Sequence, residues 1–60
     1  NLDYYIDMVM DEERQQEIYS YFKEEAQSDS LEEALQALGN EFEEEEIRLI
    51  RIKFLSEMGN

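Results

Sequence analysis

Acidic side chains dominate this sequence. Of its 60 residues, 17 are Asp or Glu and only five are Lys or Arg, which gives a formal charge of −12. Charge of this size opposes compaction because like charges repel. Leu, Ile, Val and Phe nevertheless make up a quarter of the chain, above the floor of about 20% below which highly charged chains stay disordered. We therefore expect one small acidic domain over residues 1–60, with a single core and little spare stability.

The clearest helix signals lie in the middle of the chain. Ser30 precedes Glu33 by three residues, which is the spacing of a capping box. Three leucines then recur at helical spacing, and Gly39 follows them. We expect a helix over about 30–38, with Gly39 ending it in the left-handed conformation.

A longer helix is expected to begin with Asn40 or Glu41 as its cap and to run to about Met58. Glutamates fill its first turn and basic residues come later, an order that suits the helix dipole. One segment, residues 50–54, alternates with period two and is rich in β-branched side chains, as a strand would be. The flanking glutamates and later apolar residues favour a helix there as well.

The N-terminal half contains two apolar stripes that are out of phase with each other. Asp11 stands between them and is a suitable N-cap for a helix that runs to about Ala26. The phase difference indicates a break near Asp11, with a short helical segment before it. The stripes also indicate that Tyr5 and Tyr19 pack in the core, whereas Tyr4 and Tyr21 project elsewhere.

These elements predict an all-α fold, namely a small three-helix bundle with a helix-turn-helix-like trihelical arrangement and a short N-terminal helical segment. Its expected core is formed by eight apolar residues of the three helices: Ile18, Phe22, Leu31, Leu35, Leu38, Ile47, Ile50 and Phe54.

The residue types that the chain lacks restrict its chemistry. It contains no Cys and no His, so thiolate ligands, the usual metal ligand and the usual general base are all missing. With only two glycines, Gly39 and Gly59, it cannot form a glycine-rich phosphate loop. We expect a protein that is not an enzyme and that has no cofactor, metal ion or membrane span. The same features favour a cytoplasmic location.

Part of the sequence resembles the promoter-reading helix-turn-helix of bacterial sigma factors. The resemblance covers about half of the chain and implies a DNA-binding function. A recognition helix presents its first turn to DNA, but here that turn consists of four glutamates. Residues 1–46 also carry a net charge of −14. We therefore expect no direct nucleic-acid binding and keep a divergent DNA-binding regulator as the alternative. The residues that carry the resemblance are Ser30-Leu31-Glu32-Glu33-Ala34, Glu46-Ile47-Arg48, Ile50, Lys53 and Leu55.

The excess of negative charge is itself the main functional signal. Solubility of a small domain needs a net charge of only about 2–8 in magnitude. We expect a non-catalytic protein–protein interaction module, a small regulator or inhibitor that binds a basic partner surface, with nucleic-acid mimicry as the extreme form. The mutual repulsion of neighbouring carboxylates also predicts raised pKa values in the glutamate run 43–46. The expected acidic face consists of Glu41, Glu43, Glu44, Glu45, Glu32 and Glu33.

Self-association is the second interaction that the sequence predicts. In the last helix Leu49 and Ile52 lie nearly opposite the core stripe. Uncovered Leu and Ile on a regular helix face indicate a partner surface. We therefore expect a homodimer formed through Leu49 and Ile52.

Overall fold

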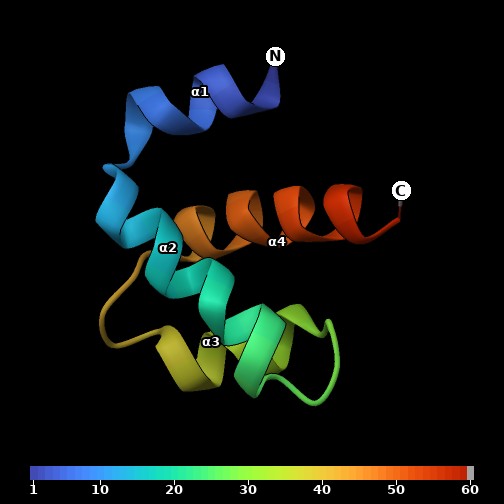
Figure 1. Cartoon of the computed structure of the whole chain (residues 1–60). Helices are drawn as coiled ribbons and strands as arrows, with labels where there is room; N and C mark the ends of the chain where they lie inside the picture. Colours follow the sequence, from blue (N-terminus) through green and yellow to red (C-terminus); the bar gives the residue numbers. More distant parts are fainter. Residues whose placement is uncertain (60) are drawn as a thin grey trace.

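Three helices and a short π-helical turn pack against the C-terminal helix. The computed structural model describes residues 1–59, which are all-helical apart from turns and loops (Figure 1), so the all-α prediction is confirmed. The C-terminal helix contacts each of the other elements, and the N-terminal helical segment is eight residues long. The elements are α1 (Leu2–Val9), α2 (Glu12–Ser20), the π-helical turn η1 (Tyr21–Glu25), α3 (Leu31–Leu38) and α4 (Glu44–Met58).

The predicted break near Asp11 is confirmed. Helix α1 begins at Asn1, whose side chain accepts a hydrogen bond from the Asp3 N–H at 2.9 Å. It ends at Met10, where the backbone is extended. The Asp11 carboxylate then accepts the Arg14 N–H at 2.9 Å and caps α2. The chain can therefore turn between α1 and α2, which run in different directions (Figure 1).

Helix α2 continues directly into the wider turn η1. The Ala26 N–H donates to the Tyr21 carbonyl five residues earlier, at 2.8 Å. This wider turn lets two consecutive aromatic side chains, Tyr21 and Phe22, both be buried. The prediction that Tyr21 projects away from the core is therefore wrong, because it assumed a regular period of 3.6 residues.

The cap of α3 is confirmed in part. The Ser30 hydroxyl accepts the Glu33 N–H at 3.2 Å, as predicted. The Glu33 carboxylate does not return to Ser30 but accepts the Gln27 N–H at 3.3 Å. Ser30 instead donates its own N–H to the Ser28 hydroxyl. Glu33 thus ties the preceding loop to the first turn of α3.

Gly39 ends α3 but not in the predicted conformation. Its φ is −65° and its ψ is −15°, which is right-handed. Its N–H donates to the Leu35 carbonyl at 2.8 Å. A Cβ at this position would collide with that same carbonyl oxygen. Glycine therefore suits position 39 because of a close backbone approach and not because of a positive φ.

Helix α4 starts later than the sequence suggested. Its N-cap is Glu43, and not Asn40 or Glu41, because the chain first turns so that Phe42 enters the core, where it is 6% exposed. The Glu41 and Phe42 N–H groups both donate to the Leu38 carbonyl at 3.0 Å. The whole of residues 50–54 is helical, so the strand interpretation is wrong and the preferred helix is confirmed.

The core draws on every element. All eight predicted core residues are buried or pack against the core. From α3, Ala34 is fully buried, whereas the leucines of that helix are only half-buried. Tyr5 was expected in the core, but 45% of it is exposed, because Ile6 takes the inward position on α1. The buried apolar residues are Ile6, Met10, Ile18, Tyr21, Phe22, Ala34, Phe42, Ile47 and Ile50. None of the helices within residues 1–59 is long and apolar enough to cross a membrane.

Two isoleucines of α4 provide a matched test of this core. Ile50 is fully buried and Ile52 is 49% exposed. We expect Ile50→Ala to lower the free energy of unfolding by about 2–5 kcal/mol, which includes the cost of the cavity. Ile52→Ala should cost less than about 1 kcal/mol. Urea unfolding followed by circular dichroism would measure both, and similar losses would contradict the placement of α4.

Candidate protein-docking site

Most of the basic side chains are held by contacts within the protein. The guanidinium of Arg14 on α2 forms a two-pronged ion pair with Glu46 on α4, at 2.7 Å between Nη2 and Oε1 and 3.2 Å between Nε and Oε2. It also donates to the Glu41 carbonyl at 3.4 Å and lies 4.8 Å from the centre of the Phe42 ring. Arg14 thus joins α2, the α3–α4 turn and the start of α4. Paired parallel hydrogen bonds of this type are stronger than neutral ones.

This ion pair sets the protonation of Glu46. Hydrogen bonding to Arg14 lowers the pKa of the Glu46 carboxyl, and the N–H of Glu43, which donates to it at 2.9 Å, acts in the same direction. Partial burial acts in the opposite direction but is the weaker effect. The expectation of a raised pKa in the glutamate run is therefore wrong for Glu46, because a cation distant in the sequence packs against it.

Three further basic side chains also have partners. Arg48 pairs with Glu44 one turn earlier, at 2.9 Å, an exposed pair of the kind that contributes little stability. The other two connect α4 to distant segments. Lys53 lies 3.7 Å from the Asp3 carboxylate of α1, and Arg51 donates to the Asp29 carbonyl at 2.6 Å.

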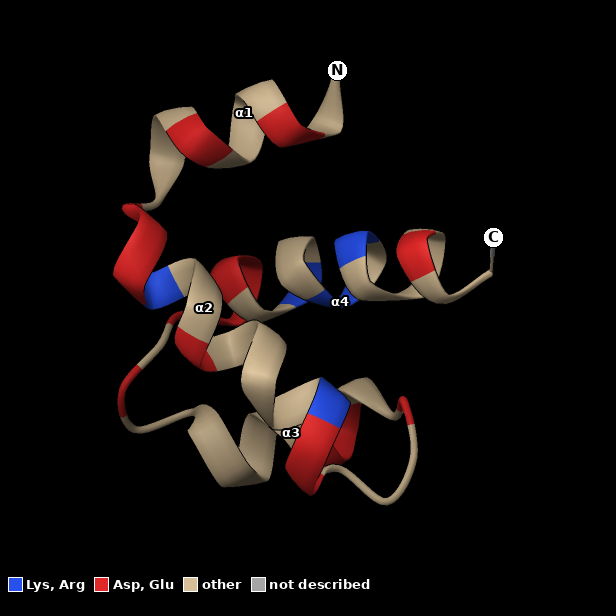
Figure 2. Ribbon diagram, viewed as in Figure 1, with Lys and Arg blue, Asp and Glu red and all other residues tan. Residues whose placement is uncertain are grey.

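The result is a surface whose negative charge is largely uncompensated. Within residues 1–59, three of the 17 carboxylates take part in ion pairs. Figure 2 shows the distribution, with basic residues at the start of α2, on η1 and along α4, and acidic residues on every element. Lys23 on η1 is exposed.

One groove concentrates this excess of negative charge. It lies between α2, η1 and the C-terminal end of α3, and has a volume of about 450 Å³. Four glutamates and no Lys or Arg line it, and its other walls include aromatic and aliphatic side chains. We call it the acidic groove. Its carboxylates belong to Glu13, Glu17, Glu25 and Glu41, its apolar surface to Tyr21, Ala37, Leu38 and Phe42, and the remaining lining residues are Gln16 and Ser20.

The spacing of four residues in the sequence could have indicated this groove. Glu13, Glu17, Tyr21 and Glu25 follow one another at intervals of four residues, and that interval places side chains on one face of a helix. Like charges at this spacing destabilise a helix by a few tenths of a kcal/mol. The row therefore contains one like-charge pair at this spacing, Glu13 and Glu17.

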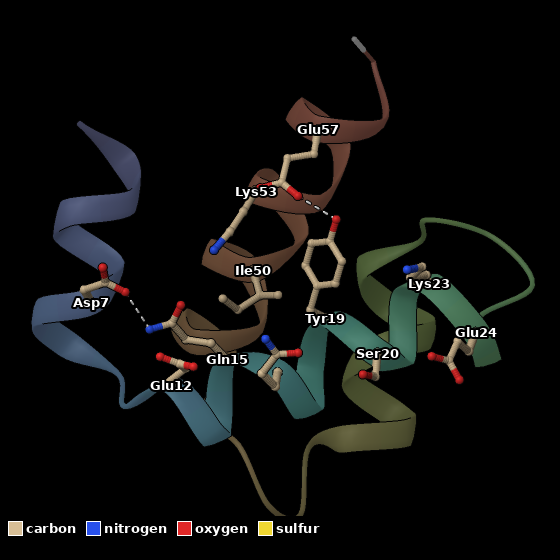
Figure 3. A pocket seen from close by; sticks show the side chains of 11 residues that line it. Asp7, Glu12, Gln15, Tyr19, Ser20, Lys23, Glu24, Ile50, Lys53 and Glu57 are labelled. Carbon is tan, nitrogen blue, oxygen red and sulfur yellow. Dashed lines mark hydrogen bonds between the residues drawn. The ribbon is translucent and has the colours of Figure 1, made fainter.

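A second groove, between α1, α2, η1 and α4, is of a different kind. It also measures about 450 Å³, but Lys23 and Lys53 line it together with four carboxylates. Figure 3 shows that several of its polar side chains are occupied with one another. Gln15 donates to Asp7 at 2.9 Å, and the Tyr19 hydroxyl donates to Glu57 at 2.6 Å. This mixed charge and internal bonding favour the acidic groove as the docking site.

The predicted acidic face is divided between the two ends of α3. Of its six glutamates, only Glu41 lines the acidic groove. Glu43 and Glu45 are exposed at the start of α4, and Glu44 beside them is paired with Arg48. Glu32 and Glu33 lie in the first turn of α3, about 10 Å or more away along an eight-residue helix. The six residues therefore fall into two groups, one at each end of α3.

The two residues predicted for self-association also differ from each other. Ile52 is 49% exposed, as expected. Leu49 is half-buried and packs against the core, because α4 is contacted on more than one side by the other helices. A dimer through this pair stays a prediction, now supported by one exposed side chain rather than two.

No protein-family model and no curated protein sequence matches this chain. In residues 1–59 no three Asp, Glu, His or Cys side chains are grouped in a way that could hold a metal ion.

The Arg14–Glu46 pair predicts a specific dependence of stability on pH. Since the folded state lowers the pKa of Glu46, the pair contributes stability above the pKa of the unfolded chain, about 4.3. That contribution is lost as the pH falls through the lower folded value. We expect Glu46→Gln to lower the melting temperature at neutral pH by an amount that shrinks towards about pH 3.

Thermal unfolding at a series of pH values would measure this difference. Glu45→Gln is the matched control, because Glu45 is the exposed neighbour and should show only a small change. A Glu46→Gln effect that is the same at every pH would contradict the role assigned to the ion pair.

Proposed function

We propose that this protein is a non-catalytic interaction module, a regulator or inhibitor, that binds a basic segment of another protein in the acidic groove. The observation that carries the proposal is the separation of charge. Four of the five basic side chains are held by contacts within the protein, whereas the acidic groove contains four glutamates and no cation.

The groove suits a lysine or arginine side chain in particular. The aliphatic stem of such a residue packs on apolar surface while its charged end stays among polar groups. Here Leu38 and Phe42 would take the stem, and Glu17 and Glu41 the charged end. Arg is favoured over Lys because its planar group binds carboxylates through two parallel hydrogen bonds. The net charge of −12 also speeds the approach of a basic partner.

Tyr21 supports this recognition as a neutral wall of the groove. Burial, helped by the charge of the nearby Glu33 carboxylate, raises the pKa of its phenol. The phenol is uncharged at physiological pH, so Tyr21 lines the groove without adding charge to it.

The two alternatives from the sequence differ in their support. Nucleic-acid mimicry is compatible with the acidic groove, because it requires a partner whose basic site normally binds nucleic acid. The order of α2, α3 and α4 is also compatible with a helix-turn-helix-like trihelical arrangement. DNA binding has less support, because the first turn of α4 consists of Glu44, Glu45 and Glu46, and DNA recognition requires a basic footprint.

A peptide of alternating Arg and Ala residues provides a direct test of the groove. We expect the triple variant Glu13→Gln, Glu17→Gln, Glu41→Gln to bind it about tenfold more weakly than the unmodified protein at low salt, as each removed ion pair contributes up to about 1 kcal/mol. Fluorescence anisotropy of the labelled peptide would measure the affinity. Amide chemical-shift changes would show which residues it contacts.

The matched control removes the same charge outside the groove. It is the triple variant Glu24→Gln, Glu32→Gln, Glu45→Gln, whose three positions are all exposed. Its affinity should change by less than about threefold, because distant charges are screened. Equal weakening of both variants would show that the peptide responds only to net charge, and the proposed groove would be wrong.

A further inference from the structure

Helix α1 carries an apolar surface that the fold leaves uncovered. Tyr4 is 69% exposed, Met8 67%, Val9 48% and Tyr5 45%. In residues 1–59 only two other large apolar side chains are comparably exposed, and both are on α4. Two-thirds of the exposed large apolar side chains thus lie on one helix of eight residues.

These four side chains form one continuous face. At 100° per residue, Tyr4, Met8, Tyr5 and Val9 follow one another around an arc of roughly 140°. The opposite side of α1 holds the fully buried Ile6 and faces the core. We call this arc the outer face of α1.

The inner side of α1 is sufficient to hold the helix in place. Ile6 and, just beyond the helix, Met10 belong to the core. Asp7 accepts a hydrogen bond from Gln15 of α2, and Asp3 pairs with Lys53 of α4. None of these contacts requires an apolar outer face, which in a monomeric soluble protein is a liability for aggregation.

The charge around the outer face indicates what kind of partner fits it. Helix α1 has no Lys or Arg, as Figure 2 shows. Around the helix the exposed Asp7 comes next to Tyr4, at one edge of the outer face. A second copy of this chain also carries −12 and would be repelled at short range. An anionic lipid surface would be repelled in the same way. A helix with one apolar side and flanking Lys or Arg residues matches both the apolar arc and its acidic edge.

We propose that the outer face of α1 binds a basic amphipathic helix of a partner protein. The apolar side of that helix packs on Tyr4, Met8 and Tyr5, and a basic side chain at its edge reaches Asp7. Tyr suits such a surface because it combines a large apolar ring with a polar tip. Met suits it because its flexible side chain adapts to different partners. This site lies on a different helix from the acidic groove and does not depend on it.

Two synthetic peptides of Leu and Lys test the proposal. In the first, the leucines recur at i, i+3, i+4 and i+7, so that they form one face of a helix. The second has the same composition in an order that scatters the leucines. We expect the amphipathic peptide to bind about tenfold or more tightly than the scattered one, measured by fluorescence anisotropy at moderate salt.

Paired variants place the binding on α1. Tyr4→Gln with Met8→Gln should weaken binding of the amphipathic peptide about tenfold or more, since central interface side chains dominate affinity. Ile52→Gln with Met58→Gln is the control, because both positions are exposed on α4, and it should leave binding unchanged. The groove variant Glu13→Gln, Glu17→Gln, Glu41→Gln should also retain the preference for the amphipathic peptide. Circular dichroism confirms that each variant remains folded.

Three results would overturn the proposal. The first is unchanged binding of the amphipathic peptide to the folded α1 variant. The second is a dimer in sedimentation equilibrium that the α1 variant abolishes, which would assign the face to a second copy. The third is co-sedimentation with phosphatidylserine vesicles that the same variant abolishes, which would assign the face to a lipid surface.

Discussion

The burial of Ile47 and Ile50 on α4 is the interaction on which the rest of the fold depends. Both side chains are fully buried, and the other helices all pack on the helix that carries them. A chain of 60 residues with a charge of −12 has too few apolar side chains for two cores. Each remaining element therefore contributes buried side chains to this one core, such as Ile6 from α1 and Ile18 from α2.

The basic side chains follow the same plan. Arg14 links α2 to α4 through Glu46, Lys53 links α4 to Asp3 of α1, and Arg51 links α4 to the loop before α3. Three of the five cations thus attach a different segment to the central helix. Because Arg14, Lys53 and Arg51 are engaged in contacts within the protein, they compensate little of the negative charge elsewhere on the surface. The outer surface is therefore acidic.

The local features of the fold could be predicted from the sequence. The break at Asp11 and the cap at Ser30 depend on side chains that bond to N–H groups three residues away, so the spacing alone indicates them. The helical state of residues 50–54 followed from the length and charge order of the surrounding segment. Four of the eight predicted core residues are buried and the other four pack against the core, because helical periodicity identifies which side of each helix is apolar.

The features that were missed all depend on contacts between distant segments. Helix α4 starts late because Phe42 packs in the core beneath Arg14. The residues next to Phe42 in the sequence do not indicate this contact. The π-helical turn buries Tyr21 against the expected period, and Gly39 is constrained by the Leu35 carbonyl.

The candidate site was missed for a related reason. The spacing of Glu13, Glu17 and Glu25 could be read from the sequence. However, the packing of α2 against the end of α3 decides that this row borders a groove containing Glu41. The predicted acidic face instead grouped glutamates that are close in sequence but lie at opposite ends of α3.

Neither proposed surface adds to the stability of the free protein. The glutamates of the acidic groove include like charges one helical turn apart, and the outer face of α1 leaves large apolar side chains in water. A basic partner segment relieves the first cost by neutralising charge, and an amphipathic helix relieves the second by removing apolar area from water. Any ligand that binds only the folded state adds to its stability through mass action. For a domain this small, with one core built on α4, occupancy of these surfaces is therefore coupled directly to the folding equilibrium.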